Sequence, residues 1–243
     1  RKFGRNFVLF VSGGASLSPQ LFRFWNAMGF RVIEGYGLTE CSPVLTANSM
    51  EKQVEGAVGT ALTGVDIRID EDEVLARGEN VFPGYYRNEA ATREVFTPDG
   101  WFRTGDVGRM DPDGSLRILG RKKELIVTAA GINVYPDAVE VILDSLPGVR
   151  ESCVLGVDRG RGEEVHAVLL LDGSGRSVGE IIREANDRLD PLQRISGFTV
   201  WPDPEFPKTT TLKIRKFLVK ERIAGHREGE GSIAVDRLTG LVA

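Results

Sequence analysis

The residues GYGLTE at positions 35–40 combine side chains that could bind a nucleotide. Tyr36 offers an aromatic face on which a flat ring can stack, and Gly37 lets a ligand approach the backbone without interference from a Cβ atom. Thr39 can donate a hydrogen bond to a phosphate oxygen, and Glu40 carries the carboxylate oxygens that Mg²⁺ prefers. The same six residues also fit a tight turn with a partly buried tyrosine and a solvated glutamate, so the stretch alone leaves both interpretations open.

Two further stretches could contribute to the same kind of site. SGGA at 12–15 follows an apolar run and could place backbone against a base, although its glycines could equally serve a strand–helix turn. WFRTGD at 101–106 ends in Asp106, whose carboxylate could accept hydrogen bonds from both hydroxyls of a ribose. An aspartate in a β-turn before a strand is the alternative.

Basic residues gather in GRKKEL at 120–125 and in PKTTTLKIRK at 207–216. Lysine acts well as a point charge toward a polyphosphate, and the second stretch places four basic residues around three threonines. A solvated run of surface charge is the ordinary explanation for both stretches.

The composition excludes several classes of protein. A formal net charge of −4 argues against binding of nucleic acid by the whole chain, since the phosphate backbone requires a basic surface. Cys41 and Cys153 lack CxxC spacing and only two histidines are present, so we expect a reduced, cytoplasmic protein without a zinc site. No apolar run approaches the ~18–20 residues that span a bilayer, although peripheral contact with a membrane stays open.

The first fifty residues predict a parallel α/β layer. Residues 7–11 form a continuous apolar run typical of a buried strand, and Ser18 and Pro19 are typical of a helix start. Gly29 can end that helix, and residues 31–36 then predict a second strand. Ligands of such sheets bind at the carboxyl ends of strands, where SGGA and GYGLTE both fall.

The remaining sequence divides into three parts. Residues 51–120 contain short alternating segments such as VDIRID, EVLARG and SLRILG, which predict antiparallel strands and a small β-barrel. Residues 121–225 predict an α+β domain with helices in YPDAVEVILDSLPGV and VGEIIREANDRL and strands in RESCVLGVD and EEVHAVLLLD. Residues 226–243 read as a loosely held tail, and the opening at Arg1 leads us to expect a fragment.

Seven stretches in order resemble the motif series of the adenylate-forming superfamily, which contains acyl-CoA synthetases, luciferases and adenylation domains. They are SGGA, GYGLTE, VGTALTGVDIRI, ENVFPGYYRNEAAT, WFRTGD, GRKKELIVTAAGINVYPDAVE and PKTTTLKIRK. The resemblance covers residues 8–222 and is greatest to long-chain fatty-acid–CoA ligases. It implies an α/β fold: the C-terminal part of a large adenylate-forming domain, with a parallel layer and a barrel at 1–50 and 51–120, then a small mobile α+β lid domain at 121–225.

The resemblance implies activation of a fatty acid with ATP and Mg²⁺, followed by transfer of the acyl group to the thiol of CoA. The roles that it implies are assigned as follows. Gly14 and Ala15 line the adenine, Tyr36 and Gly37 bind it, Thr39 contacts the α-phosphate, Glu40 binds Mg²⁺, Asp106 and Arg121 hold the ribose, and Lys213 bridges the carboxylate and phosphate oxygens. Thr39 and Lys213 are the expected catalytic residues, Lys123 is the expected hinge, and Gly131 is the expected CoA contact.

The sequence departs from the family pattern at three points. A Ser/Thr/Gly-rich phosphate loop ending in Pro-Lys-Gly is absent, so we expect these 243 residues to be inactive alone. Leu212 stands where the lysine motif commonly has glycine, and Ala130 stands where related ligases often have one.

Three alternatives stay open. The thiol can belong to a carrier protein instead of CoA, the protein can be a relative that only binds a nucleotide or partner, or the chain can be an unrelated α/β binding module. The acyl chain length and the oligomeric state are not predicted.

Overall fold

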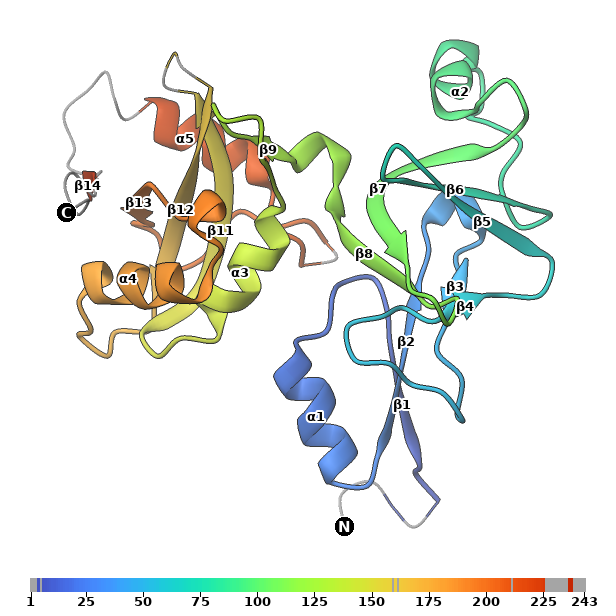
Figure 1. The fold of residues 1–243 in the computed structure, drawn as a ribbon, viewed down its shortest axis with the longest axis horizontal. Coiled ribbons are helices and arrows are strands. Elements are labelled where there is room, and N and C mark those ends of the chain that lie inside the picture. The colour runs from blue at the N-terminus through green and yellow to red at the C-terminus, as the bar shows by residue number, and fades with distance from the viewer. Residues whose placement is uncertain are drawn as a thin grey trace. The chain divides into compact units, whose positions relative to one another are not determined.

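The structure, a computed structural model, describes residues 4, 6–158, 160, 162–210, 212–225 and 236–237. The chain forms two compact units, residues 1–122 and 123–243, which are described separately (Figure 1). Apart from residues 236–237, the expected tail at 226–243 lies outside the described residues.

The first unit begins with the parallel layer predicted from the sequence. Strands β1 (Leu9–Ser12) and β2 (Arg31–Tyr36) pair in parallel, and helix α1 (Pro19–Ala27) connects them (Figure 1). The Ser18 hydroxyl caps the helix by accepting a hydrogen bond from the backbone N–H of Leu21 at 3.2 Å. The short strands β3 (Thr46–Ala47) and β4 (Thr60–Ala61) extend the sheet in antiparallel order, with the 3₁₀ turn η1 (Thr39–Cys41) after β2.

A second sheet of the first unit is antiparallel but open. Its strands are β5 (Val65–Asp70), β6 (Glu73–Gly78), β7 (Phe102–Met110) and β8 (Leu116–Arg121), in that spatial order. The predicted barrel was wrong: among the described strands, no pairing joins β5 to β8. Four strands are too few to close around a filled interior, for which about eight are typical. Helix α2 (Glu89–Val95), between β6 and β7, was not anticipated.

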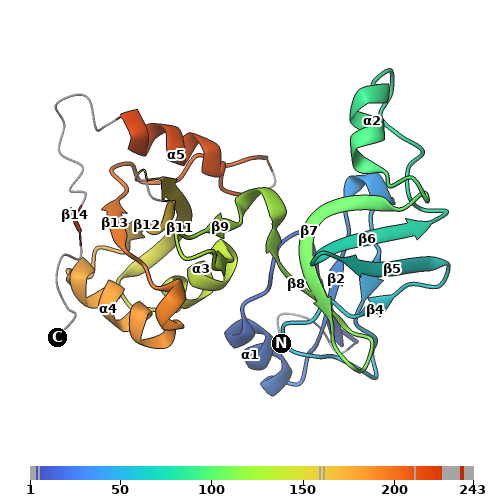
Figure 2. The same cartoon turned by 45° about the horizontal axis from the view of Figure 1, so that its top comes forward.

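The second unit is an α+β domain built on a four-stranded sheet (Figure 2). Strands β11 (Val149–Asp158) and β12 (Glu163–Leu171) form an antiparallel pair, and β13 (Gly197–Val200) lies parallel to β12. The other elements are η2 (Lys122–Glu124), β9 (Ile126–Val127), β10 (Asn133–Val134), α3 (Pro136–Asp144), α4 (Val178–Arg188), η3 (Pro191–Gln193), α5 (Lys216–Gly225) and β14 (Asp236–Arg237).

Alternation along β11 and β12 divides the second unit into two apolar cores. Val154 belongs to a cluster with residues of α3 and α4, including the predicted apolar face of α4 at Ile181 and Ile182. Cys153, the neighbouring residue, belongs to the opposite cluster, which includes Val219 of α5. Helices α3 and α4 therefore cover one face of this sheet and α5 covers the other.

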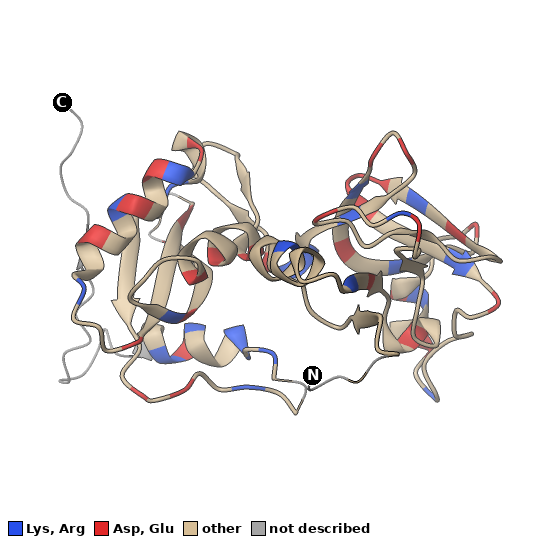
Figure 3. Ribbon diagram, turned by 90° about the horizontal axis from the view of Figure 1, so that it is seen from below, with Lys and Arg blue, Asp and Glu red and all other residues tan. Residues whose placement is uncertain are grey.

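Acidic and basic residues both occur on the helices of the second unit (Figure 3): they alternate along α4, whereas α3 carries acidic residues alone. None of the helices that the structure describes is long and apolar enough to span a membrane.

Candidate active site

The structure brings together three of the predicted site residues of the first unit. The Tyr36 hydroxyl, at the end of β2, donates a hydrogen bond of 2.6 Å to Oδ2 of Asp106 on β7, 70 residues away in sequence. The Arg121 Nε atom lies 2.9 Å from Oδ1 of the same carboxylate. Asp106 and Arg121 face each other in the register of β7 and β8, so regular sheet pairing sets this contact.

Burial makes this cluster electrostatically unusual. Asp106 is 5% exposed, whereas the Arg121 side chain remains partly exposed beside it. Burial and, secondly, the Asp106 charge raise the pKa of Tyr36 well above its ordinary value near 10. Tyr36 therefore stays a neutral donor at physiological pH, and the Asp106 carboxylate lies between this hydroxyl and the Arg121 guanidinium. The group presents hydrogen-bonding oxygens and an aromatic ring at one place, which suits a sugar attached to a flat base.

A threonine fixes the backbone on which Asp106 sits. The Thr104 hydroxyl donates to the carbonyl of Val74 on β6 at 2.8 Å and accepts the backbone N–H of Asp106 at 3.1 Å. A guanidinium N–H of Arg121 donates to the Thr104 carbonyl at 3.2 Å. The two residues predicted to hold a ribose, Asp106 and Arg121, are therefore also connected through Thr104 of strand β7.

Sequence reasoning missed Glu73, a buried carboxylate behind this cluster. It is 4% exposed and lies 3.0 Å from a guanidinium nitrogen of Arg103 and 3.0 Å from the Lys122 ammonium. Its other oxygen accepts the backbone N–H of Gly105 at 3.3 Å. Glu73 thus binds Gly105, which precedes Asp106, and Lys122, which follows Arg121. Its place at the start of an alternating strand gave no signal, because its partners come from β7 and η2.

Glu40, the predicted magnesium ligand, is half-buried in η1 and is held by an unpredicted tyrosine. The Tyr85 hydroxyl donates to Oε1 of Glu40 at 3.0 Å, and the backbone N–H of Phe82 donates to the Glu40 carbonyl at 2.8 Å. Tyr85 lies in the family-like stretch ENVFPGYYRNEAAT, but that resemblance gave it no role. Thr39 is exposed next to Glu40.

One carboxylate fits a magnesium ion that arrives with a nucleotide. Among the described residues, no group of three or more His, Cys, Asp or Glu side chains could hold a metal ion. Mg²⁺ is usually bound through one or two carboxylates together with substrate phosphates, and Glu40 supplies the required hard oxygen. The donor set therefore suits a metal–phosphate complex better than a site made by protein alone.

The predicted glycine positions have different structural reasons. A Cβ atom at Gly37 would lie 1.9 Å from the carbonyl oxygen of Pro43, so only glycine fits there. Gly14 adopts φ +84°, which favours glycine, and it is exposed together with Ala15 after β1. Gly37 is thus required by the local packing whether or not a ligand binds, and the role of all three in binding adenine stays a prediction.

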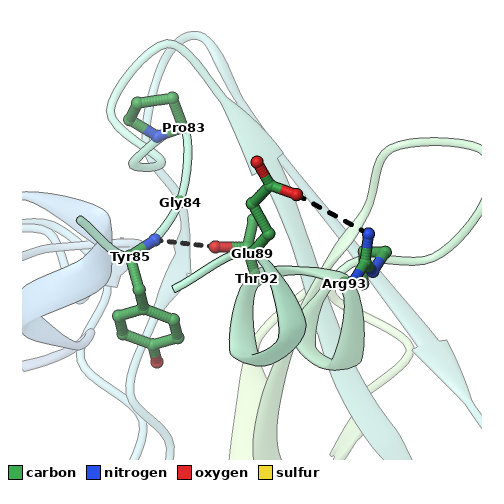
Figure 4. Close-up of a pocket in the computed structure, with 6 residues that line it drawn as sticks. All are labelled: Pro83, Gly84, Tyr85, Glu89, Thr92 and Arg93. Carbon is green, nitrogen blue, oxygen red and sulfur yellow. Dashed lines mark hydrogen bonds and ion pairs between the residues drawn. The ribbon is translucent and has the colours of Figure 1, made fainter. Parts of the chain in front are cut away.

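A pocket of about 360 Å³ lies between the loop before α2 and the helix itself (Figure 4). The Thr92 hydroxyl accepts the backbone N–H of Tyr85 at 2.9 Å, and Glu89 and Arg93 form an ion pair across one helical turn (Figure 4). The pocket contains none of the predicted nucleotide-binding residues. The hydrogen bond from the Tyr85 backbone N–H to Thr92 fixes the backbone of Tyr85, and the Tyr85 hydroxyl in turn donates to Glu40.

In the second unit, Lys213 is exposed in a hairpin before α5. The backbone N–H of Thr209 donates to the Lys213 carbonyl at 2.8 Å, and the N–H of Lys213 donates to the Thr209 hydroxyl at 3.2 Å. Leu212, which replaces the usual glycine, adopts φ +64°. The loop therefore has the left-handed backbone that glycine favours, although this conformation is sterically unfavourable for leucine.

The remaining predicted residues lie at a boundary and in a turn. Lys123 is the first residue of the second unit and is exposed. Gly131 adopts φ +74° and would have open space around a Cβ atom, as a contact for an approaching ligand requires. Their assignments as hinge and CoA contact stay predictions, as does the role of Lys213.

Comparison with known proteins gives matches over most of the chain. Residues 2–86 match the family described as AMP-binding enzyme. The chain is 35% identical to the long-chain-fatty-acid–CoA ligase FadD15 of Mycobacterium bovis over 93% of its own length and 42% of that protein. It is 29% identical to the malonate–CoA ligase of Arabidopsis thaliana over 90% of its own length and 39% of that enzyme.

The fold also matches a solved structure of a CoA synthetase. The o-succinylbenzoate CoA synthetase MenE of Bacillus subtilis, in complex with ATP and magnesium ion, superposes with a TM-score of 0.78 at 30% identity. The match covers 87% of this chain and 46% of that one. The chain thus spans less than half the length of each relative named here.

Proposed function

We propose that this chain, which belongs to the AMP-binding family of adenylate-forming enzymes, supplies the nucleotide-binding and lysine-bearing parts of an acid–thiol ligase. The observation that carries the proposal is the contact between Tyr36, Asp106 and Arg121, at 2.6 and 2.9 Å. The last residues of β2 and β8 meet a residue from the middle of β7 there, with Glu40 four residues beyond Tyr36.

In the proposed first step, an oxygen of the substrate carboxylate attacks the α-phosphorus of ATP, the bond from that phosphorus to the β-phosphate oxygen breaks, pyrophosphate leaves, and an acyl-adenylate forms. Tyr36 would stack on the adenine while Asp106 accepts hydrogen bonds from the ribose hydroxyls, with Arg121 holding that carboxylate in place. Thr39 would donate to the α-phosphate. Mg²⁺ held by Glu40 would neutralise charge on the phosphate oxygens when it is bound.

Lys213 would provide the positive charge at the bond being made. Its ammonium group would lie between the attacking carboxylate and the α-phosphate, where negative charge develops. In the second step the thiol of CoA attacks the acyl carbon and releases AMP, with Gly131 near the incoming thiol arm. Because Lys213 belongs to the second unit and the other groups belong to the first, the two units would have to adopt an orientation that joins them, and Lys123 is the proposed hinge.

A long-chain fatty acid is the proposed substrate, because the identity to a long-chain fatty-acid ligase exceeds that to a malonate ligase. The test is pyrophosphate exchange by the complete gene product that contains these residues, with a series of fatty acids, malonate and o-succinylbenzoate. Exchange driven best by long-chain acids is expected; exchange driven only by malonate or o-succinylbenzoate would overturn the substrate assignment and leave the ligase class standing.

The roles of individual residues are tested by separating the two half-reactions. Lys213→Ala should lower adenylation by roughly 10²–10³-fold, the effect of losing one electrostatic stabiliser, and should change thioester formation from supplied acyl-adenylate little. Lys220→Ala is the matched control, since Lys220 is an exposed lysine of α5 paired with Glu163. Equal adenylation by the Lys213→Ala variant and the unsubstituted protein would refute the assigned role.

A further inference from the structure

Lys216, three residues after Lys213, is surrounded by acidic residues. Its Nζ atom lies 2.9 Å from a carboxylate oxygen of Glu140, 3.1 Å from one of Glu124 and 3.5 Å from one of Asp137. The Lys216 side chain is only 15% exposed, unlike an ordinary surface lysine. Burial would lower the pKa of Lys216, but the carboxylates, Glu140 foremost, raise it above the ordinary lysine value. Lys216 therefore remains charged and held in one place.

The three acids come from separate parts of the second unit. Glu124 belongs to η2, at the start of the unit, whereas Asp137 and Glu140 belong to α3. Oε1 of Glu140 also accepts the backbone N–H of Val154 on β11 at 2.7 Å. One ammonium group thus connects the first residues of the unit, helix α3, the central sheet and the first residue of α5.

The hairpin that presents Lys213 is fixed at both ends. The backbone N–H of Arg215 donates to the carbonyl of Pro207 at 2.8 Å, closing the hairpin at its base. On one side of the base, Lys208 lies 2.8 Å from a carboxylate oxygen of Glu151 on β11. Lys216 lies on the other side of the base. Ile214, between Lys208 and Lys216 in sequence, packs against the apolar cluster that includes Cys153 and Val219.

We propose that Lys216 is a positioning residue, which fixes the base of the hairpin so that the Lys213 side chain projects from the second unit in one defined direction. The inference rests on the proposed function of Lys213. Lys216 itself touches no substrate, because its charge is already satisfied by the three carboxylates. Losing its charge would leave those carboxylates facing one another and would displace the start of α5, and with it the hairpin.

The first test uses the complete gene product and compares the two half-reactions. Lys216→Met should reduce adenylation by about 10–100-fold, the effect expected of a reacting group displaced by about 1 Å, and change thioester formation from supplied acyl-adenylate by less than about threefold. Lys216→Arg should restore most of the adenylation because it keeps the charge. Lys220→Met, in the next turn of the same helix, is the control. Equal losses in both half-reactions, or no rescue by arginine, would overturn the proposal.

A second test needs no activity and separates this proposal from the function it rests on. In the 243-residue chain, Lys216→Met should accelerate hydrogen exchange of the Thr209, Lys213 and Arg215 amides by about tenfold or more, while strand β12 keeps its protection. If the Lys216→Met substitution broadly unfolds the unit, Glu124→Gln, which removes one of the three acids, should give the same local pattern more weakly. Unchanged exchange in the hairpin would refute the anchoring, whereas adenylation that survives Lys213→Ala would refute the proposed function alone.

Discussion

Replacing Tyr36 by phenylalanine should weaken the first unit through the loss of a single hydrogen bond. The Tyr36 hydroxyl donates to the buried Asp106 carboxylate at 2.6 Å, and a hydrogen bond to a charged group contributes about 1.5–3 kcal/mol. Asp106 keeps its contact with Arg121 at 2.9 Å, so the carboxylate is not left without a cation. We therefore expect a loss of about 1.5–2 kcal/mol, the lower part of that range.

The effect is best measured by native-state hydrogen exchange of the amides of β7, the strand that carries Asp106, because the chain contains two units that can unfold separately. A loss of about 1.5–2 kcal/mol corresponds to exchange that is about 10- to 30-fold faster. In an Asp106→Asn background the same substitution should cost roughly half as much, because a neutral acceptor forms a weaker bond. Tyr85→Phe, which removes a hydroxyl from the partly exposed Glu40, is the matched control and should leave β7 unchanged.

The same variant also separates the hydroxyl from the ring. Phenylalanine keeps the aromatic face, so nucleotide binding by the complete gene product should fall much less with Tyr36→Phe than with Tyr36→Ala. Exchange of β7 within about twofold of the unsubstituted protein would refute the claim that this hydrogen bond stabilises the site.

Three further outcomes are expected. Because the pKa of Tyr36 is raised in the folded chain, the unfolded chain loses the Tyr36 hydroxyl proton first as the pH rises above 10. The free energy of unfolding should therefore fall with rising pH. Urea titration at several pH values should show a shallower fall in Tyr36→Phe, which lacks the titrating hydroxyl. Leu212→Gly should raise the free energy of unfolding by no more than about 1 kcal/mol. Glycine relieves the unfavourable left-handed backbone at φ +64°, but it also gives the unfolded chain more conformational entropy to lose on folding. Thermal unfolding measures this change in stability. Burial raises the pKa of both thiols, to about 11 for Cys41, so neither Cys41 nor Cys153 should react with a thiol reagent at pH 8 until the chain is denatured.

The sequence predicted the elements whose signals are local. The Ser18 cap, the helix after Pro19 and the apolar face of α4 all appear where expected, because capping and helical periodicity depend on neighbours within a few residues. The closed barrel was wrong because closure depends on strand number and pairing at the edges, which alternation along a single strand does not encode.

The site was predictable in its residues more than in its support. Tyr36 and Asp106 were identified from residue type and from a family resemblance, and the structure places them in contact. Glu73 and Lys216 were missed because each looked like ordinary surface charge in its own segment. Each is buried by oppositely charged groups that lie tens of residues away in sequence, and only the folded chain brings these groups together.

The boundary at Lys122 and Lys123 lies between two ion pairs that belong to different units. The Lys122 side chain is bound by Glu73 of the first unit, and the Glu124 side chain is bound by Lys216 of the second. The backbone that is not fastened by either pair is therefore about one residue long, around Lys123. At the hinge proposed above, rotation would therefore be confined to about one residue of backbone, and inserting a single glycine after Lys123 should change adenylation without removing any chemical group.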